Sequence, residues 1–362
     1  MGCLRSASPE EVDALVTRAH PKPRGTPGHV AGGIVKNCRL CANGCRIPPG
    51  GRGACGARWN DGRRVTPVAG PSRALLTWYL DSNPTNCCLA YCCPATTGSD
   101  DPQFSITNRG PERGTFNLAV FLWGCNFDCL FCQNPGHREA WRVDPSGCGG
   151  TGIPSPSVGV PDLLAVLRSH PEVTCVCFFG GSPEPHLSFT IRLARAAREA
   201  FPGRVLRFCW EWNGAGHPAL VDRCAELARE TGGIVKFDLK AFHPNVHRAL
   251  CGVGNERTLE NFARVAKTYP RAAQRHPVVG ATTPLVSHHV DEAEVEALAE
   301  FVAACDPYAP YSLLVFHPDD RTRDLPVTPL EQARAAVKAA RKHLPHARLG
   351  NAALLGFSEL SS

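Results

Sequence analysis

Three cysteines that follow an apolar run are spaced for metal chemistry. Cys125, Cys129 and Cys132 stand at a C-x3-C-x2-C spacing directly after the run 117–123. Iron–sulfur clusters are held by cysteine thiolates, and a cubane cluster has four irons to ligate. Three thiolates leave one iron open for a substrate or cofactor, as a catalytic zinc keeps an open position when the protein supplies three ligands. The alternative is a loop with three free thiols, which this spacing directly after a strand disfavours.

The loop sequence GCNFDCLFCQN resembles that of the radical S-adenosylmethionine enzymes. Within them it is most similar to the AmmeMemoRadiSam-system radical SAM proteins and the pyruvate formate-lyase activating enzymes. The resemblance implies a 4Fe-4S cluster on Cys125, Cys129 and Cys132, with the amino and carboxylate groups of S-adenosylmethionine on the fourth iron. It also implies that one electron passing through the cluster cleaves this cofactor to methionine and a 5'-deoxyadenosyl radical.

Composition and charge exclude several classes of protein. The 362 residues are 43% hydrophobic and 20% charged, which is ordinary for a globular chain with one large core or two smaller ones. The net charge of +6 is spread along the sequence, without the basic block of a nucleic-acid arm. No run reaches the length of a membrane span, and no cleavable apolar signal is present. With nineteen cysteines at metal-binding spacings, we expect a reduced, cytoplasmic protein.

A second group of cysteines lies near the amino terminus. Cys38, Cys41, Cys45 and Cys55 fall within 18 residues that are rich in glycine and proline. This segment has too little apolar surface to fold by itself, so a bound metal ion would be needed to order it. The block resembles the amino-terminal segment of the AmmeMemoRadiSam-system proteins, including Arg58. Zinc and an auxiliary iron–sulfur cluster both suit four thiolates, and packing as small apolar residues is the remaining alternative.

Other cysteines have no metal-binding spacing. In the pairs Cys87-Cys88 and Cys92-Cys93, neighbouring side chains of an extended chain would diverge. We therefore expect packing, with Cys88 and either Cys92 or Cys93 as the alternative extra ligands. Five further cysteines fall on expected strands or helices and are predicted to be packed: Cys175, Cys177, Cys209, Cys224 and Cys305.

The elements that position these residues alternate between two periods. Short apolar runs predict strands at 118–123, 173–179, 204–210, 233–239, 278–282 and 311–316. Helical periods predict helices at 161–169, 187–200, 218–230, 258–268, 291–304 and 328–343. Six strand–helix units predict an α/β fold, a partial (β/α)6 TIM-like barrel with its active site at the carboxyl ends of the strands.

The remaining segments predict an extension and a tail. Residues 1–115 form the extension, with a surface helix at 9–19, a linker rich in proline and glycine at 21–28, and the cysteine-rich segment 36–60. A short strand is expected at 77–80. The barrel spans 116–350 and the carboxyl-terminal tail 351–362.

Polar and small residues follow the predicted strands where a cofactor would bind. After the second strand come Gly180, Gly181, Ser182 and Glu184, where the related enzymes have Gly-Gly-Glu-Pro against the amino group of the cofactor. This chain has serine in place of that glutamate, so the contact passes either to Glu184 or to the backbone. A plain strand-to-helix turn is the structural alternative.

Further strand ends supply five more candidate residues: Glu211, Asn213, Asp238, Lys240 and His317. The resemblance implies that Asp238 and Lys240 lie beside S-adenosylmethionine and that His317 contacts it. By position, Lys240 could pair with the carboxylate of the cofactor, and Glu211 with Asp238 could hold a cation. An ordinary solvated ion pair is the alternative for Asp238 and Lys240.

These features predict a radical S-adenosylmethionine enzyme that abstracts hydrogen from a substrate. Activation of a glycyl-radical enzyme or modification of a peptide is one expectation. Radical chemistry on a small molecule or RNA, and a non-catalytic iron–sulfur or metal-binding module, are the others. A flavodoxin or ferredoxin is the expected electron donor, and no membrane or nucleic-acid partner is indicated.

Overall fold

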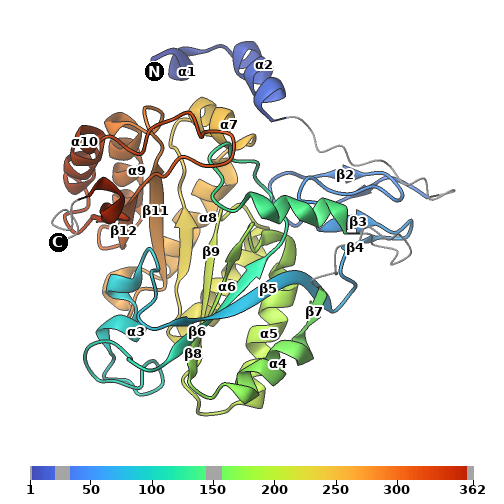
Figure 1. The fold of residues 1–362 in the computed structure, drawn as a ribbon, viewed down its shortest axis with the longest axis vertical. Coiled ribbons are helices and arrows are strands. Elements are labelled where there is room, and N and C mark those ends of the chain that lie inside the picture. Colours follow the sequence, from blue (N-terminus) through green and yellow to red (C-terminus); the bar gives the residue numbers. More distant parts are fainter. Residues whose placement is uncertain (1, 21–32, 144–156, 357–362) are drawn as a thin grey trace.

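The structure, a computed structural model, describes residues 2–20, 33–143 and 157–356. Its centre is a nine-stranded sheet in the order β13-β12-β11-β10-β9-β8-β6-β5-β7 (Figure 1). Seven strands are parallel: β6 (Phe116–Leu122), β8 (Val173–Gly180), β9 (Arg207–Trp212), β10 (Val235–Asp238), β11 (Val279–Leu285), β12 (Tyr311–Val315) and β13 (Arg348–Gly350). The six predicted strands are therefore confirmed, with β13 added.

Helices follow the parallel strands and cover the outer face of the sheet. The six predicted helices are confirmed as α4 (Val160–Ser169), α5 (Leu187–Ala200), α6 (Pro218–Thr231), α8 (Glu256–Thr268), α9 (Glu292–Cys305) and α10 (Leu330–Arg341). A seventh, α7 (Pro244–Cys251), was not predicted and lies between β10 and α8. Outward-facing strand residues such as Val176, Phe208 and Phe237 are fully buried against this helical layer. The chain is thus a partial TIM-like barrel, as predicted.

Two antiparallel strands extend the sheet beyond β6. The strand β5 (Arg73–Ser82) pairs with the whole of β6 through its residues 76–82. Its residues 73–75 pair with β7 (Ser157–Gly159). It contains the predicted strand 77–80 and is longer at both ends. It crosses the lower part of the sheet in Figure 1.

The amino-terminal extension is built from small elements. The helix α2 (Pro9–Ala19) is confirmed, and Ser8 and Glu11 form a capping box at its start. Other short elements are α1 (Gly2–Ser6), α3 (Pro94–Thr97), β1 (Lys36–Asn37), β2 (Arg46–Ile47), β3 (Arg58–Asn60) and β4 (Val65–Pro67). The predicted linker at 21–28 lies outside the described residues, as does the tail from residue 357.

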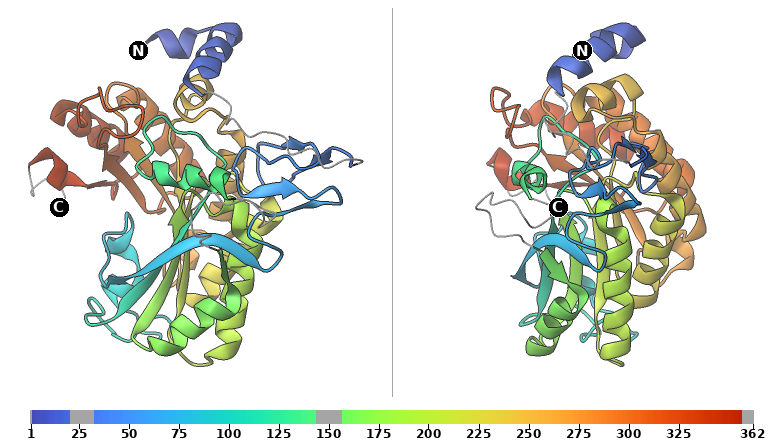
Figure 2. Two further views of the ribbon diagram at one scale, coloured as in Figure 1. Left: turned by 45° about the vertical axis from the view of Figure 1, so that its right-hand side comes forward. Right: turned by 90° about the vertical axis from the view of Figure 1, so that its right-hand side faces the viewer.

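Five short 3-10 turns complete the described chain. They are η1 (Ala90–Cys92), η2 (Pro135–Arg142), η3 (Glu184–His186), η4 (Arg271–Ala273) and η5 (Ala352–Leu355). Figure 2 shows the strands β1–β4 of the amino-terminal extension beside the sheet, toward the end of the barrel where α7 lies. No helix in the described ranges is long and apolar enough to cross a membrane.

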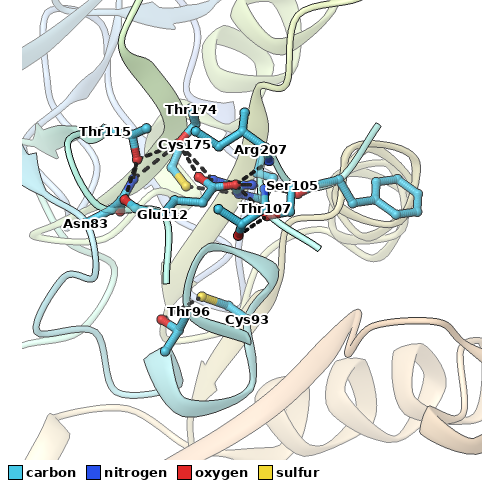
Figure 3. Close-up of polar contacts among 12 residues, drawn as sticks. Asn83, Cys93, Thr96, Ser105, Thr107, Glu112, Thr115, Thr174, Cys175 and Arg207 are labelled. Atoms are coloured by element: carbon cyan, nitrogen blue, oxygen red, sulfur yellow. Dashed lines mark hydrogen bonds and ion pairs between the residues drawn. The ribbon is translucent and has the colours of Figure 1, made fainter. Parts of the chain in front are cut away.

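A buried ion pair fastens the connector 98–115 to the amino ends of the strands. Arg207 at the start of β9 donates two hydrogen bonds to the Glu112 carboxylate, at 2.9 and 2.6 Å (Figure 3). Ser105 and Thr174 donate to the same carboxylate at 2.7 and 2.8 Å. Both charged groups are almost fully buried, so each depends on the other and on these hydroxyls.

Candidate active site

A cavity of about 200 Å³ lies at the carboxyl ends of the parallel strands. Most of the predicted site residues line it together: Cys125, Cys129, Cys132, Gly180, Gly181, Ser182, Glu211, Asn213, Asp238 and Lys240. Right-handed crossovers bring the carboxyl ends of all parallel strands to one rim, so side chains far apart in sequence meet there.

Two glycines let the cysteine loop fold tightly against its neighbours. Gly124 adopts a φ of +88°, and a Cβ there would lie 2.6 Å from the carbonyl oxygen of Cys55. A Cβ on Gly181 would lie 2.3 Å from the carbonyl oxygen of Gly124. The Ser182 amide donates to that same carbonyl at 3.1 Å. The loop is thereby held between the end of β8 and the amino-terminal cysteine block.

The thiols of the loop receive hydrogen bonds from the surrounding chain. The Phe127 amide and the Asn213 side-chain amide donate to Cys125 Sγ at 3.4 and 3.3 Å. The His137 imidazole lies 3.7 Å from Cys132 Sγ. Hydrogen bonds to ligating sulfurs are one of the means by which a protein sets the reduction potential of a cluster.

Burial sets the ionisation of these thiols. It raises the pKa of Cys125 well above its usual range and that of Cys132 to about 11, and the neighbouring Cys129 raises both further. The pKa of Cys129 is lowered, chiefly by a hydrogen bond with Cys251 and also by the charge of Lys240. Buried thiolates need a nearby positive charge, and a bound metal supplies it. The set of donors fits an iron–sulfur cluster.

The end of β10 contributes an ion pair to the cavity lining. Lys240 and Asp238 are in contact, and the Lys240 ammonium lies 5.5 Å from the centre of the Phe131 ring. Burial opposes the charge on Lys240, but Asp238, Cys129 and Cys251 outweigh it, and the pKa of Lys240 stays well above its usual value. The buried Oδ1 of Asp238 has no partner in the described structure. A bound S-adenosylmethionine, which has an amino group and ribose hydroxyls, fits beside such an acceptor.

Two of the predicted cofactor-binding residues do not line the cavity. Glu184 is fully buried and accepts a hydrogen bond from Ser182 Oγ. Its pKa is raised by burial, which the Ser182 bond opposes. Ser182 and the glycines therefore face the cavity, with Glu184 behind them. His317 is exposed, immediately after Phe316, which does line the cavity.

An ionic network that the sequence did not indicate holds the outside of the loop. Asp128 accepts hydrogen bonds from Arg321 at 2.7 Å and pairs with Arg138 at 3.0 Å and His20 at 3.1 Å. Arg321 also donates to the carbonyl of Ala19 at the end of α2. These partners come from three distant segments, so no local spacing pointed to them.

The amino-terminal block packs directly on this loop. Asn43 donates to the carbonyl of Asn126 at 2.6 Å, and the Ala42 amide donates to Ala215 after β9 at 2.9 Å. Burial is the main cause that raises the pKa of Cys41, Cys45 and Cys55, and the nearby thiol of Cys38 raises the pKa of each of the three further. The structure thus brings the four predicted cysteines into one small region beside the loop.

Comparisons with known proteins agree with this site. The sequence profile described as "Radical SAM superfamily" matches residues 120–302. The chain is 25% identical over 277 residues to an isethionate sulfite-lyase activating enzyme of Desulfovibrio desulfuricans, covering 60% of this chain and 85% of that protein. It is 23% identical over 238 residues to a protein of Methanocaldococcus jannaschii described as "Putative glycyl-radical enzyme activating enzyme", covering 63% of this chain and 86% of that protein.

Among solved structures, a domain of pyruvate-formate lyase-activating enzyme from Bacteroides vulgatus is similar, with a TM-score of 0.38 and 23% identity. The match covers 49% of this chain and 98% of that one. The profile match spans the cysteine loop and most of the strands that line the cavity, and ends before β12, whose Leu314 and Val315 also line it. The chain belongs to the radical SAM superfamily and is an enzyme that uses a 4Fe-4S cluster and S-adenosylmethionine.

Proposed function

We propose that this enzyme abstracts a hydrogen atom from a protein substrate, as an activating enzyme does. The observation that carries the proposal is the similarity to two activating enzymes, which covers 85% of the first and 86% of the second. The names of both relatives refer to the activation of another enzyme, so a protein is the substrate class that they favour.

The residues of the cavity divide the work in this proposal. When bound, the cluster and S-adenosylmethionine supply a 5'-deoxyadenosyl radical. Cys125, Cys129 and Cys132 hold the cluster, and Phe127 and Phe131 keep water away from it. These residues account for the loop side of the cavity.

The strand ends hold the cofactor in the same proposal. Gly180, Gly181 and Ser182 let the backbone approach its amino group, and Glu184 orients Ser182. Lys240 pairs with its carboxylate, while Glu211, Asn213 and Asp238 bind its polar groups. His317 would join this set only if its exposed side chain turned inward.

The wider proposal concerns organisation and partners. The chain divides into an extension at 1–115, a barrel at 116–350 and a tail at 351–362, with the tail supplying Asn351 to the cavity. Cys38, Cys41, Cys45 and Cys55 bind a second metal, zinc or an auxiliary iron–sulfur cluster. Flavodoxin or ferredoxin supplies the electron. We place the protein in the cytoplasm, where reducing conditions keep cysteines as thiols.

The catalytic part of the proposal is tested by cofactor cleavage. We expect the reconstituted, reduced enzyme to convert S-adenosylmethionine to 5'-deoxyadenosine, and Cys129→Ala to abolish this because one iron loses its thiolate. Cys305→Ala, at the end of α9 and outside the cavity, is the matched control and keeps the activity. Equal deoxyadenosine from Cys129→Ala and the intact enzyme would refute the assigned cluster.

The substrate class is tested by isotope transfer. The enzyme is incubated with extracts of the source organism grown in deuterium oxide and separated into protein, RNA and small-molecule fractions. Deuterium in 5'-deoxyadenosine marks the fraction from which hydrogen was taken. Deuterium from the protein fraction supports the proposal. Deuterium only from the RNA or the small-molecule fraction overturns it and identifies the alternative class.

A further inference from the structure

The inside of the barrel carries thiols and charges where such barrels are usually filled with branched apolar side chains. Strand residues that alternate with the buried outer layer face a single cavity in this lumen: Asn117, Cys175, Cys177, Cys209, Glu211 and Lys236. Cys175 and Cys224 are buried as expected, although Cys175 also lines this cavity, whereas Cys177 and Cys209 line it and are only half-buried. Apolar packing alone therefore does not account for the residues that line this part of the lumen.

The segment 83–97 brings further thiols into the lumen. Cys87, Cys93 and Thr96 line the same cavity, and Figure 3 shows Cys93 and Thr96 together on this segment. Ser312 on β12 donates to the carbonyl of Cys88 at 2.7 Å. A Cβ on Gly280 of β11 would lie 2.4 Å from the Leu89 side chain, so the glycine makes room for the segment. The segment is therefore fixed across the inner face.

Three potential ligand atoms meet there. The sulfurs of Cys87 and Cys88 and a carboxylate oxygen of Glu211 all lie within 4.8 Å of one another, the one such group of three found in the described residues. Two thiolates on a tetrahedral zinc lie about 3.8 Å apart, given Zn–S bonds of about 2.3 Å. The chain turns at Cys87 and Cys88, so their side chains do not diverge as expected. Cys88 thus groups with Cys87 and Glu211 rather than with Cys92 or Cys93.

The charge of the group also favours a cation. Lys236 is buried, with its ammonium 2.8 Å from Cys87 Sγ, 3.8 Å from Cys177 Sγ and 3.5 Å from Glu211 Oε2. Bound as thiolates, the two cysteines and the Glu211 carboxylate, which is 39% exposed, would leave an excess of two negative charges over the ammonium of Lys236. One divalent ion neutralises it, and an uncompensated buried charge is costly.

We propose that Cys87, Cys88 and Glu211 form a binding site for a thiophilic divalent metal ion, zinc in the first instance, inside the barrel. Thiolates and a carboxylate suit a metal of borderline softness. Three protein ligands leave a fourth position, which opens to the cavity beside Cys177. Phe179 and Glu211 line both this cavity and the candidate active site, so in the function proposed above one carboxylate oxygen of Glu211 would bind the ion and the other would face the cofactor.

Zinc protection of the individual cysteines tests the site in the intact, full-length protein. The reduced protein is treated with N-ethylmaleimide with and without zinc, and each cysteine is followed by peptide mass spectrometry. We expect zinc to slow modification of Cys87 and Cys88 at least tenfold and to leave Cys305 unchanged. Because each peptide is read separately, zinc at the amino-terminal block does not confuse the result. Equal rates at Cys87 and Cys88 with and without zinc overturn the proposal.

Ligand variants provide an independent measurement. Cys87→Ser and Glu211→Gln should each lower the zinc bound per chain by one equivalent, or weaken its binding at least tenfold, whereas Cys305→Ser should not. Circular dichroism confirms the fold of each variant, and the protection assay on the unmodified chain decides the matter for any variant that does not fold. Unchanged zinc affinity and content in both folded variants would refute the site, and Lys236 would then be the cation that balances the charge of these residues.

Discussion

At the scale of single residues, Asn213 couples the end of β9 to the cysteine loop. Its side-chain amide donates to Cys125 Sγ at 3.3 Å and to the Asn126 side chain at 3.0 Å. Its backbone amide donates to Ser182 Oγ at 3.3 Å. One side chain therefore touches a proposed cluster ligand while its backbone supports the proposed cofactor contact. It was predicted from its position after a strand, but the bond to sulfur could not be read from sequence.

Replacing this side chain should shift the reduction potential of the cluster. An N–H donor stabilises the reduced form most, because that form carries more negative charge. We expect Asn213→Ala to lower the potential by roughly 40–60 mV, the equivalent of one hydrogen bond of about 1–1.5 kcal/mol in a one-electron couple. A redox titration followed by electron paramagnetic resonance measures it. Asn245→Ala, at the start of α7, is the control. An unchanged potential in Asn213→Ala would contradict the assigned bond.

Position at the carboxyl end of a strand predicted most of the residues that line the cavity, but it did not predict which side chains point into it. Gly180, Asp238 and Lys240 were predicted because parallel strands share a rim, and they line the cavity. Glu184 lies behind Ser182, and His317 is exposed, because a position after a strand does not fix where a side chain points. Cys251 was not among the predicted site residues. Its hydrogen bond with Cys129 depends on packing of α7 against the loop.

At the scale of elements, the pair of Arg207 and Glu112 locks the connector to β8 and β9. Removal of one partner leaves the other buried and uncompensated. We expect Arg207→Met to lower the free energy of unfolding by about 3–5 kcal/mol, measured by urea denaturation. Arg207→Met with Glu112→Leu should recover part of the loss, because no isolated charge remains. Arg264→Met removes a partly exposed partner of Asp222 and should cost about 1 kcal/mol or less. Comparable losses for Arg207→Met and Arg264→Met would argue against this role.

The docking of α2 on the cysteine loop should depend on pH. Burial opposes the charge on His20, but Asp128 outweighs it and raises the pKa of His20. A raised folded pKa stabilises the docked state below the unfolded value of about 6.5, and this contribution is lost as pH rises through the folded pKa. We expect hydrogen exchange of the α2 amides, corrected for intrinsic rates, to quicken about two- to fivefold from pH 6 to pH 8.

The variant His20→Gln isolates this titration. Glutamine keeps hydrogen-bonding groups near Asp128 but carries no charge, so corrected exchange of α2 should be nearly independent of pH. Thr17→Ala lies on the same helix, away from this pair, and should retain the dependence of the unmodified chain. The same pH dependence in His20→Gln would assign the effect to another group.

The sequence predicted the repeated strands and helices better than it predicted the additional helix and the pairing between distant strands. Each strand–helix unit was visible because apolar runs of period two alternate with helical periods. The helix α7 was missed, since one helix per strand was expected and it has only eight residues. The antiparallel pairing of β5 with β6 and β7 was also not predicted, because register between distant segments leaves no local signal.

At the scale of the whole molecule, the extension packs against the outside of the cysteine loop. Cys55 touches Gly124 of the loop through its carbonyl, Cys55 and Cys125 line a common cavity, and His20 reaches the loop from α2. These contacts join segments more than 60 residues apart in sequence, a separation that follows from the residue numbers. Cysteine spacing predicted that the extension binds metal, but only tertiary packing shows that this metal would lie beside the catalytic loop.

Subtractive elemental analysis should identify the metal of the extension. In a Cys125/Cys129/Cys132 triple-alanine variant the catalytic cluster is absent, so the remaining iron and zinc belong to other sites. Adding Cys41→Ser and Cys45→Ser should remove the metal of the extension, while adding Cys305→Ser should remove none. Iron lost with the cysteine pair indicates an auxiliary cluster, and zinc lost indicates a structural knuckle. No loss of either metal would refute a metal site. Because the block packs on the loop, the same pair of substitutions in the otherwise unmodified chain should also lower its cluster content.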